Sequence, residues 1–204
     1  MSRCISRDGG RNQALASSMS FSSDYLNDLR EVLARLDSHA IEQGIAMLRE
    51  ARDRDRRVFV IGNGGSAAIA SQMVVDIGKG ASLDRPKRFK IVTLTDSVPW
   101  ITALANDISY DVVFLEQLKN FAERGDVVIG MSCSGTSRNV VLAMQWARQN
   151  GLRTLGLGKD GATPLRAASD LFVPIPSIHY GRLEDCFFII THILCYAFME
   201  NPKL

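Results

Sequence analysis

Two short polar turns constrain this chain more than any other feature of its sequence. Residues 62–68 (GNGGSAA) and 132–137 (SCSGTS) each follow an aliphatic run and precede a segment with the residue pattern of a helix. Glycines let the backbone approach a ligand closely, and the hydroxyls and free amides of a helix start can surround an anion. The sequence therefore predicts two anion-binding turns. Their serine and threonine content favours a phosphosugar over a nucleotide as the ligand.

Short aliphatic segments alternate with helical patterns along most of the chain. This alternation is typical of a parallel sheet covered on both faces, so we expect an α/β fold with a five-stranded parallel sheet flanked by helices, of the flavodoxin-like type. The expected strands are residues 58–61, 89–94, 127–131, 153–157 and 171–173. The expected helices are about 67–77, 99–105 with 112–124, 138–149, 163–168 and 181–199.

Two further helices precede the first strand. Apolar residues recur at helical spacing from Tyr25 to Leu36, with Ser22 or Ser23 as the expected cap, and a second pattern covers about residues 39–53. Residues 1–21 show no periodicity and are expected to form a flexible tail. The domain is therefore predicted to cover residues 22–204, as a single unit with an N-terminal helical pair.

The predicted functional site lies at one edge of the sheet. In parallel sheets, ligands collect at the carboxyl ends of the strands, near the point where strand order reverses. Both polar turns follow strands there, and so does a third polar segment, residues 93–97 (TLTDS). The first turn matches neither the dinucleotide fingerprint GxGxxG nor the phosphate loop GxxxxGK[ST].

Composition excludes several other classes of protein. The net charge of +2 is too small to indicate nucleic-acid binding, and acids interrupt the basic run at residues 51–57 (ARDRDRR), which we expect to end a solvated helix. No apolar stretch approaches the ~20 residues that span a bilayer. The start of the chain lacks the apolar core of a secretory signal, which favours the cytoplasm. The four cysteines show no CxxC spacing, and Cys133 is expected to fill the second turn rather than react.

Four segments, in this order and spacing, resemble the sugar isomerase (SIS) domain family, and within it the phosphoheptose isomerase branch. They are residues 62–68 (GNGGSAA), 93–97 (TLTDS), 105–118 (ANDISYDVVFLEQL) and 132–140 (SCSGTSRNV). The resemblance covers roughly residues 22–200. It implies an aldose–ketose isomerase of carbohydrate metabolism that converts sedoheptulose 7-phosphate to D-glycero-D-manno-heptose 7-phosphate. It also implies a homo-oligomer, a dimer or homotetramer, with sites completed across subunits.

The resemblance assigns roles to the polar turns. The phosphate would be held by the hydroxyls of the second turn and by the serine that begins the helix after the first. Asn63 and Gly64 would line the sugar, and Asp96 would hydrogen-bond its hydroxyls. The residues expected to bind phosphate are Ser66, Ser132, Ser134, Thr136 and Ser137.

The isomerisation needs a base for a carbon-bound proton and an acid for the carbonyl oxygen. Family members carry His, Glu, Gln and His at four positions that here are Gln72, Asp76, Glu184 and His192. The resemblance implies Asp76 as base and His192 as acid. It also implies a divalent metal such as zinc on Asp76, Glu184 and His192, with Gln72 a further candidate ligand. Because an amide oxygen binds zinc weakly compared with imidazole, the sequence leaves the metal open.

Other interpretations remain open at this point. The chain could be a non-catalytic SIS protein that binds a sugar phosphate or a protein partner such as a replication initiator, since three of the four positions differ from the family pattern. It could instead be an isomerase of another sugar pathway. His192 could be a hydrogen-bonded core residue, and His179 is expected to be a surface loop residue.

Overall fold

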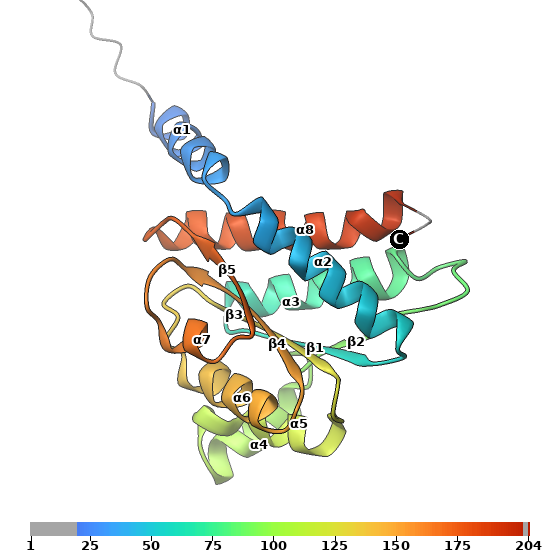
Figure 1. Ribbon diagram of the computed structural model, residues 1–204. Coiled ribbons are helices and arrows are strands. Elements are labelled where there is room, and N and C mark those ends of the chain that lie inside the picture. The colour runs from blue at the N-terminus through green and yellow to red at the C-terminus, as the bar shows by residue number, and fades with distance from the viewer. Residues whose placement is uncertain (1–19, 202–203) are drawn as a thin grey trace, which may run out of the picture.

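The protein is a three-layer α/β structure built on one parallel sheet (Figure 1). The computed structural model describes residues 20–201 and 204. Five parallel strands lie in the order β2-β1-β3-β4-β5, which is the flavodoxin-like order. They are β1 (Arg57–Ile61), β2 (Lys90–Thr93), β3 (Val127–Ser132), β4 (Arg153–Lys159) and β5 (Leu171–Ile175). The predicted fold class and strand number are confirmed.

Helices cover both faces of the sheet. In Figure 1, α2, α3 and α8 lie on one side of the strands and α4 to α7 on the other. The α-helices are α1 (Phe21–Ala34), α2 (Ser38–Asp53), α3 (Gly65–Val75), α4 (Val98–Asp107), α5 (Leu115–Phe121), α6 (Arg138–Gln149), α7 (Pro164–Ala167) and α8 (Tyr180–Glu200). No helix among the described residues is long and apolar enough to cross a membrane.

Strand residues alternate between two apolar cores. In β1, Val58 and Val60 join the core under α2, α3 and α8, whereas Phe59 and Ile61 join the core under α5 and α6. This alternation follows from the two-residue period of a strand. Because both faces of the sheet are buried, the strands consist mainly of apolar residues, and this is what made them recognisable in the sequence.

The N-terminal helices pack on the α3–α8 side. The side chain of Ser20, not Ser22 or Ser23 as predicted, caps α1, because its oxygen accepts the Ser23 amide at 3.4 Å. Tyr25 donates to Asp185 of α8 at 2.6 Å and so ties α1 to that helix. The predicted tail lies largely outside the described residues, and the helix begins at Phe21.

Two predicted helices differ in the structure. The first continues beyond α3 as a π-helix, Asp76–Gly80, a conformation that often occurs at functional sites. The expected helix 112–124 is divided into a 3₁₀ turn (Tyr110–Val112) and α5, and it ends early, at Phe121. The early end has a cause: the buried Asp126 carboxylate accepts the amides of Glu123 and Arg57, so the chain must turn there to enter β3.

Truncation of a residue in the central strand tests this account of the core. Ile129 in β3 is fully buried, so Ile129→Ala leaves a cavity and is expected to lower the free energy of unfolding by about 2–5 kcal/mol. Val92 in the edge strand β2 is 46% exposed, and Val92→Ala is expected to cost less than about 1 kcal/mol. Urea unfolding followed by circular dichroism measures both values. Equal losses would contradict the assignment of β3 to the centre of the core.

Candidate functional site

The first predicted turn connects β1 to α3 with its backbone exposed to a ligand. Gly64 has φ of 56° and occupies the N-cap position of α3, a conformation that favours glycine. Gly62 cannot carry a side chain, because a Cβ there would lie 2.7 Å from the Cβ of Ser66. Ser66 is buried in the first turn of α3, and its amide donates to the Asn63 carbonyl at 3.0 Å. The turn therefore presents a helix start to the carboxyl edge of the sheet.

Asn63 is held by two residues that sequence reasoning did not single out. Its carboxamide exchanges two hydrogen bonds with that of Asn139, at 2.9 and 2.8 Å, and it also accepts the Tyr110 hydroxyl at 2.9 Å. Asn139 is buried near the start of α6. These contacts join the two polar turns and fix the orientation of the Asn63 side chain. Asn139 and Tyr110 both lie within the family-like segments, but no residue pattern predicts this contact.

The second turn brings together the hydroxyls that were predicted to hold phosphate. Ser132 Oγ lies 3.0 Å from Ser137 Oγ, and it accepts the Gly135 amide at 3.1 Å. Ser134 Oγ accepts both the amide and the hydroxyl of Thr136, at 3.2 and 3.0 Å. Ser137 is the N-cap residue of α6, and its side chain makes no capping bond. The four hydroxyls thus surround a helix N-terminus, an arrangement suited to an anion.

Asp96 faces α3 across the site. Its carboxylate accepts the Ser71 hydroxyl of α3 at 2.5 Å and the Thr95 hydroxyl at 3.3 Å. It lies after β2, is exposed, and retains lone pairs for further donors. The three predicted polar segments therefore all follow neighbouring strands β2, β1 and β3 at one edge of the sheet.

Cys133 lies inside the second turn as a structural residue. Its side chain is buried, and burial raises the pKa of the thiol to about 11, with the nearby Glu184 carboxylate acting in the same direction. A thiol with this pKa remains protonated at neutral pH and is a poor nucleophile. The geometry agrees with the expected role of a loop filler.

Asp76, at the start of the π-helix that follows α3, and His192 of α8 form a half-buried pair. Asp76 Oδ2 lies 3.5 Å from His192 Nε2, and Asp76 Oδ1 accepts the Gln72 amide at 3.0 Å. The His192 ring packs edge-on between the side chains one helical turn away on either side, Phe188 and Tyr196. His192 is thus not a core residue. The structure brings together three of the four side chains that the resemblance singled out: Gln72, Asp76 and His192.

Glu184 lies at the other end of this pair of helices. Its carboxylate rests against Gly65 in the first turn of α3, where a Cβ would come within 2.6 Å of both its oxygens. A carboxylate at a helix N-terminus is favoured by the helix dipole. Within one chain, therefore, Asp76, Glu184 and His192 do not lie close enough together to share one metal ion. In the described residues, no group of three or more His, Cys, Asp or Glu side chains is arranged to hold a metal.

His179 is part of a helix cap. It is the N-cap residue of α8, where its Nδ1 accepts the Arg182 amide at 3.3 Å. It also contacts Tyr25 edge-on. It therefore positions the start of α8, the helix that carries Glu184 and His192.

The site has two chemical capacities. The hydroxyl-lined turns can hold a phosphate and sugar hydroxyls, and the carboxylate–imidazole pair can move protons. They lie at opposite ends of α3, whose 11 residues rise about 16 Å at 1.5 Å each.

Comparison with known proteins agrees with this arrangement. The model of the SIS domain family matches residues 24–158. A phosphoheptose isomerase from Geobacter sulfurreducens is 38% identical over 167 residues, which cover 81% of this chain and 85% of the relative. One from Pelobacter propionicus is 37% identical over 168 residues, covering 82% and 88%.

A solved structure shares the fold. The phosphoheptose isomerase from Francisella tularensis superposes with a TM-score of 0.80 at 23% identity, over 89% of this chain and all of the other. The matching family model, the identity of the relatives and the shared sheet all lead to the same assignment. The chain belongs to the SIS domain family and, within it, to the phosphoheptose isomerases.

Proposed function

We propose that this protein interconverts sedoheptulose 7-phosphate and D-glycero-D-manno-heptose 7-phosphate. The observation that carries the proposal is the Asp76–His192 contact at 3.5 Å in a chain that also retains the hydroxyl-lined turn. Relatives named phosphoheptose isomerase support the choice of a seven-carbon sugar phosphate. The buried thiols of Cys133, Cys186 and Cys195 support a reducing compartment, the cytoplasm.

Each group has a role in the proposed reaction. Ser132, Ser134, Thr136 and Ser137 hold the phosphate with Ser66, while Asn63, Gly64 and Asp96 contact the sugar. The Asp76 carboxylate takes the proton from C1 of the ketose as His192 protonates the C2 carbonyl oxygen, which gives an enediol. Asp76 then returns a proton to C2, and His192 accepts the proton from the C1 hydroxyl, which leaves the aldose. Both groups end in the state in which they began.

The proposal routes no step through a metal ion, because Glu184 lies at the far end of α3 from Asp76 and His192. The Gln72 amide holds the Asp76 carboxylate by donating to it. The carboxylate–imidazole pair supplies both proton transfers without further groups.

We further propose a homo-oligomer, a dimer or tetramer, whose sites form between subunits. Phe188 and Tyr196 pack against the His192 ring, and Val75 and Ile193 are the chain neighbours of Asp76 and His192. These four apolar side chains are 36–54% exposed, and exposed apolar side chains that gather at one place typically mark an interface. The roughly 16 Å of α3 between the pair and the first turn also supports a shared site, in which one sugar contacts turns from one subunit and Asp76 and His192 from another.

The non-catalytic alternative is not favoured. The matched relatives are named as isomerases, and the Asp76–His192 contact that the proposed chemistry needs is present.

Substitution of the acid–base pair tests the proposed chemistry. Asp76→Asn and His192→Gln keep the side-chain shape but remove proton transfer, so each is expected to lower kcat about 10²–10⁴-fold. His39→Gln is the matched control, because His39 is exposed on α2 and its one side-chain hydrogen bond within the described residues is to Gln43. Steady-state conversion of sedoheptulose 7-phosphate measures these effects. Unchanged kcat in both variants would show that Asp76 and His192 do not take part in proton transfer.

Substitution of the phosphate turn tests substrate binding. Ser134→Ala and Thr136→Val each remove a hydroxyl donor to the phosphate, so KM is expected to rise roughly 10- to 100-fold. Thr102→Val is the control, because within the part of the chain that the structure describes that hydroxyl donates only to carbonyls of its own helix. Initial rates over a range of substrate concentrations separate KM from kcat. A KM that the turn variants leave unchanged would place the phosphate elsewhere.

Mixed oligomers test whether the site is shared. At substrate concentrations well below the KM of the Thr136→Val variant, His192→Gln and Thr136→Val subunits that are unfolded together and refolded are expected to turn over substrate faster than either variant refolded alone. The mixed sites would pair an intact histidine with an intact turn. Light scattering establishes the mass of each assembly. A monomeric wild type, or mixtures no more active than the separate variants, would contradict a shared site.

A further inference from the structure

Arginines gather at the amino edge of the sheet, opposite the site described above. Arg54, Arg56, Arg124 and Arg153 line a hollow of about 260 Å³. They come from the end of α2, the starts of β1 and β4, and the turn before β3. The remaining lining residues are Met47, Glu50, Ala51, Gly125 and Val127. Nothing in the proposed isomerase reaction uses this edge.

The acids near this hollow are mostly engaged elsewhere. Within residues 51–57, Asp53 pairs with Lys87 at 3.6 Å, and Asp55 pairs with Lys90 at 2.5 Å. The buried Asp126 is satisfied by backbone amides. Asp53 also pairs with Arg52 of the basic run, at 3.0 Å. Within the described residues, neither aspartate forms an ion pair with Arg54 or Arg56, the two arginines of the run that line the hollow.

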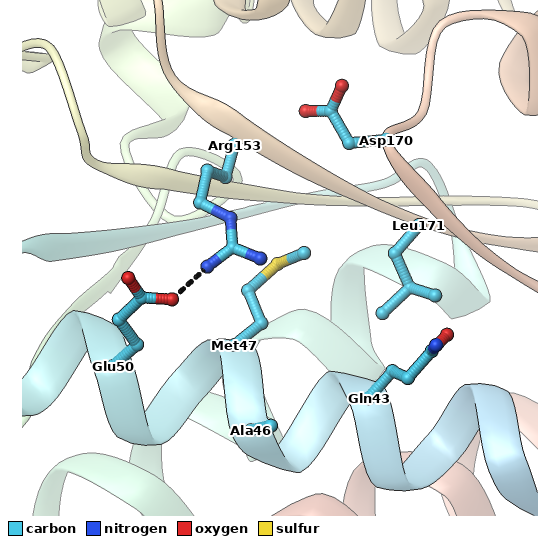
Figure 2. Close-up of a pocket in the computed structure, with 7 residues that line it drawn as sticks. All are labelled: Gln43, Ala46, Met47, Glu50, Arg153, Asp170 and Leu171. Carbon is cyan, nitrogen blue, oxygen red and sulfur yellow. Dashed lines mark hydrogen bonds and ion pairs between the residues drawn. The ribbon is translucent and has the colours of Figure 1, made fainter.

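Glu50 is the one carboxylate that lines the hollow, and two arginines share it. Its Oε1 pairs with Arg54 at 2.9 Å, and its Oε2 pairs with Arg153, the contact drawn in Figure 2. Within the described residues, the side chains of Arg56 and Arg124 have no hydrogen bond or ion pair. Four guanidinium groups and one carboxylate leave three positive charges uncompensated.

Arg56 and Arg124 each pack against a glycine. A Cβ on Gly125 would lie 3.3 Å from Arg56 Nε, and one on Gly151 would lie 3.1 Å from Arg124 Cγ. Both glycines have positive φ, 92° and 78°, and the Gly125 amide donates to the Gly151 carbonyl at 3.0 Å. The two hydrogen-bonded turns thus form one backbone surface, against which the side chains of both arginines pack.

Helix dipoles do not account for this charge. α2 ends at Asp53, just before Arg54, and a helix C-terminus offers about half a negative charge that fades beyond its last turn. This partial negative charge offsets part of the positive charge of one arginine. Clustered like charges in a partly enclosed hollow repel each other and attract an anion.

We propose that this hollow is a second anion site, which binds a metabolite carrying a diphosphate group. Guanidinium forks bind phosphate oxygens bidentately and more specifically than ammonium groups do. A monophosphate brings about −1.5 to −2 charges, fewer than the hollow leaves uncompensated, whereas a diphosphate brings more. The site lies at the opposite ends of the strands from the phosphosugar turn, so both sites can be occupied at once.

Inorganic pyrophosphate is the probe that tests this site, in two measurements on the full chain. In amide NMR spectra, it is expected to shift the signals of Gly125 and Gly151. In calorimetry, Arg56→Gln and Arg124→Gln are each expected to weaken binding about tenfold or more. Arg56→Lys keeps the charge but loses the fork, and is expected to weaken binding by less.

Arg30→Gln is the matched control, because it removes the same charge from α1, where Arg30 contacts the Asn27 side chain. It is expected to leave binding unchanged, and the Arg56 and Arg124 variants are expected to keep wild-type isomerase activity and melting temperature. Three results would overturn the proposal: shifts confined to residues 132–137, equal weakening by Arg30→Gln, or sulfate binding as tightly as pyrophosphate. None of these outcomes depends on the isomerase reaction.

Discussion

The parallel pairing of β1 with β3 is the contact on which the site depends. It places Ile61 beside Gly130, so the two polar turns leave the sheet side by side at the point where strand order reverses. The reciprocal hydrogen bonds between Asn63 and Asn139 then lock the turns together. Residues 62–68 and 132–137, which are far apart in sequence, thereby lie side by side at one edge of the sheet.

The second half of the site depends on α8 packing along α3. Glu184 contacts the first turn of α3, and His192 contacts Asp76 where α3 becomes a π-helix. Within a single chain, the first turn of α3 and the Asp76–His192 pair are therefore separated along one helix pair. The exposed apolar residues next to His192 are the basis for the proposal that a neighbouring subunit brings the turns and the acid–base pair together.

The sequence predicted the fold because both faces of the sheet are buried, so each strand is a short aliphatic run between helical patterns. Ser132, Ser134, Thr136 and Ser137 were predictable because one turn carries them. The contacts of Asn139 and Tyr110 with Asn63 were not, because they depend on how α6 and the segment after α4 pack. The position of Glu184 could not be read from spacing on α8, which says nothing about the neighbouring helix. The pairing of Asp53 and Asp55 with lysines likewise follows from tertiary structure alone.

The central claim is that Asp76 and His192 move a proton between two carbons of a phosphorylated sugar. Proton NMR of the purified protein with sedoheptulose 7-phosphate in deuterated buffer tests it most directly. The account predicts an aldoheptose phosphate with deuterium at C2, because a base that exchanges with solvent returns the proton there. Folded protein that gives neither product nor exchange would contradict it.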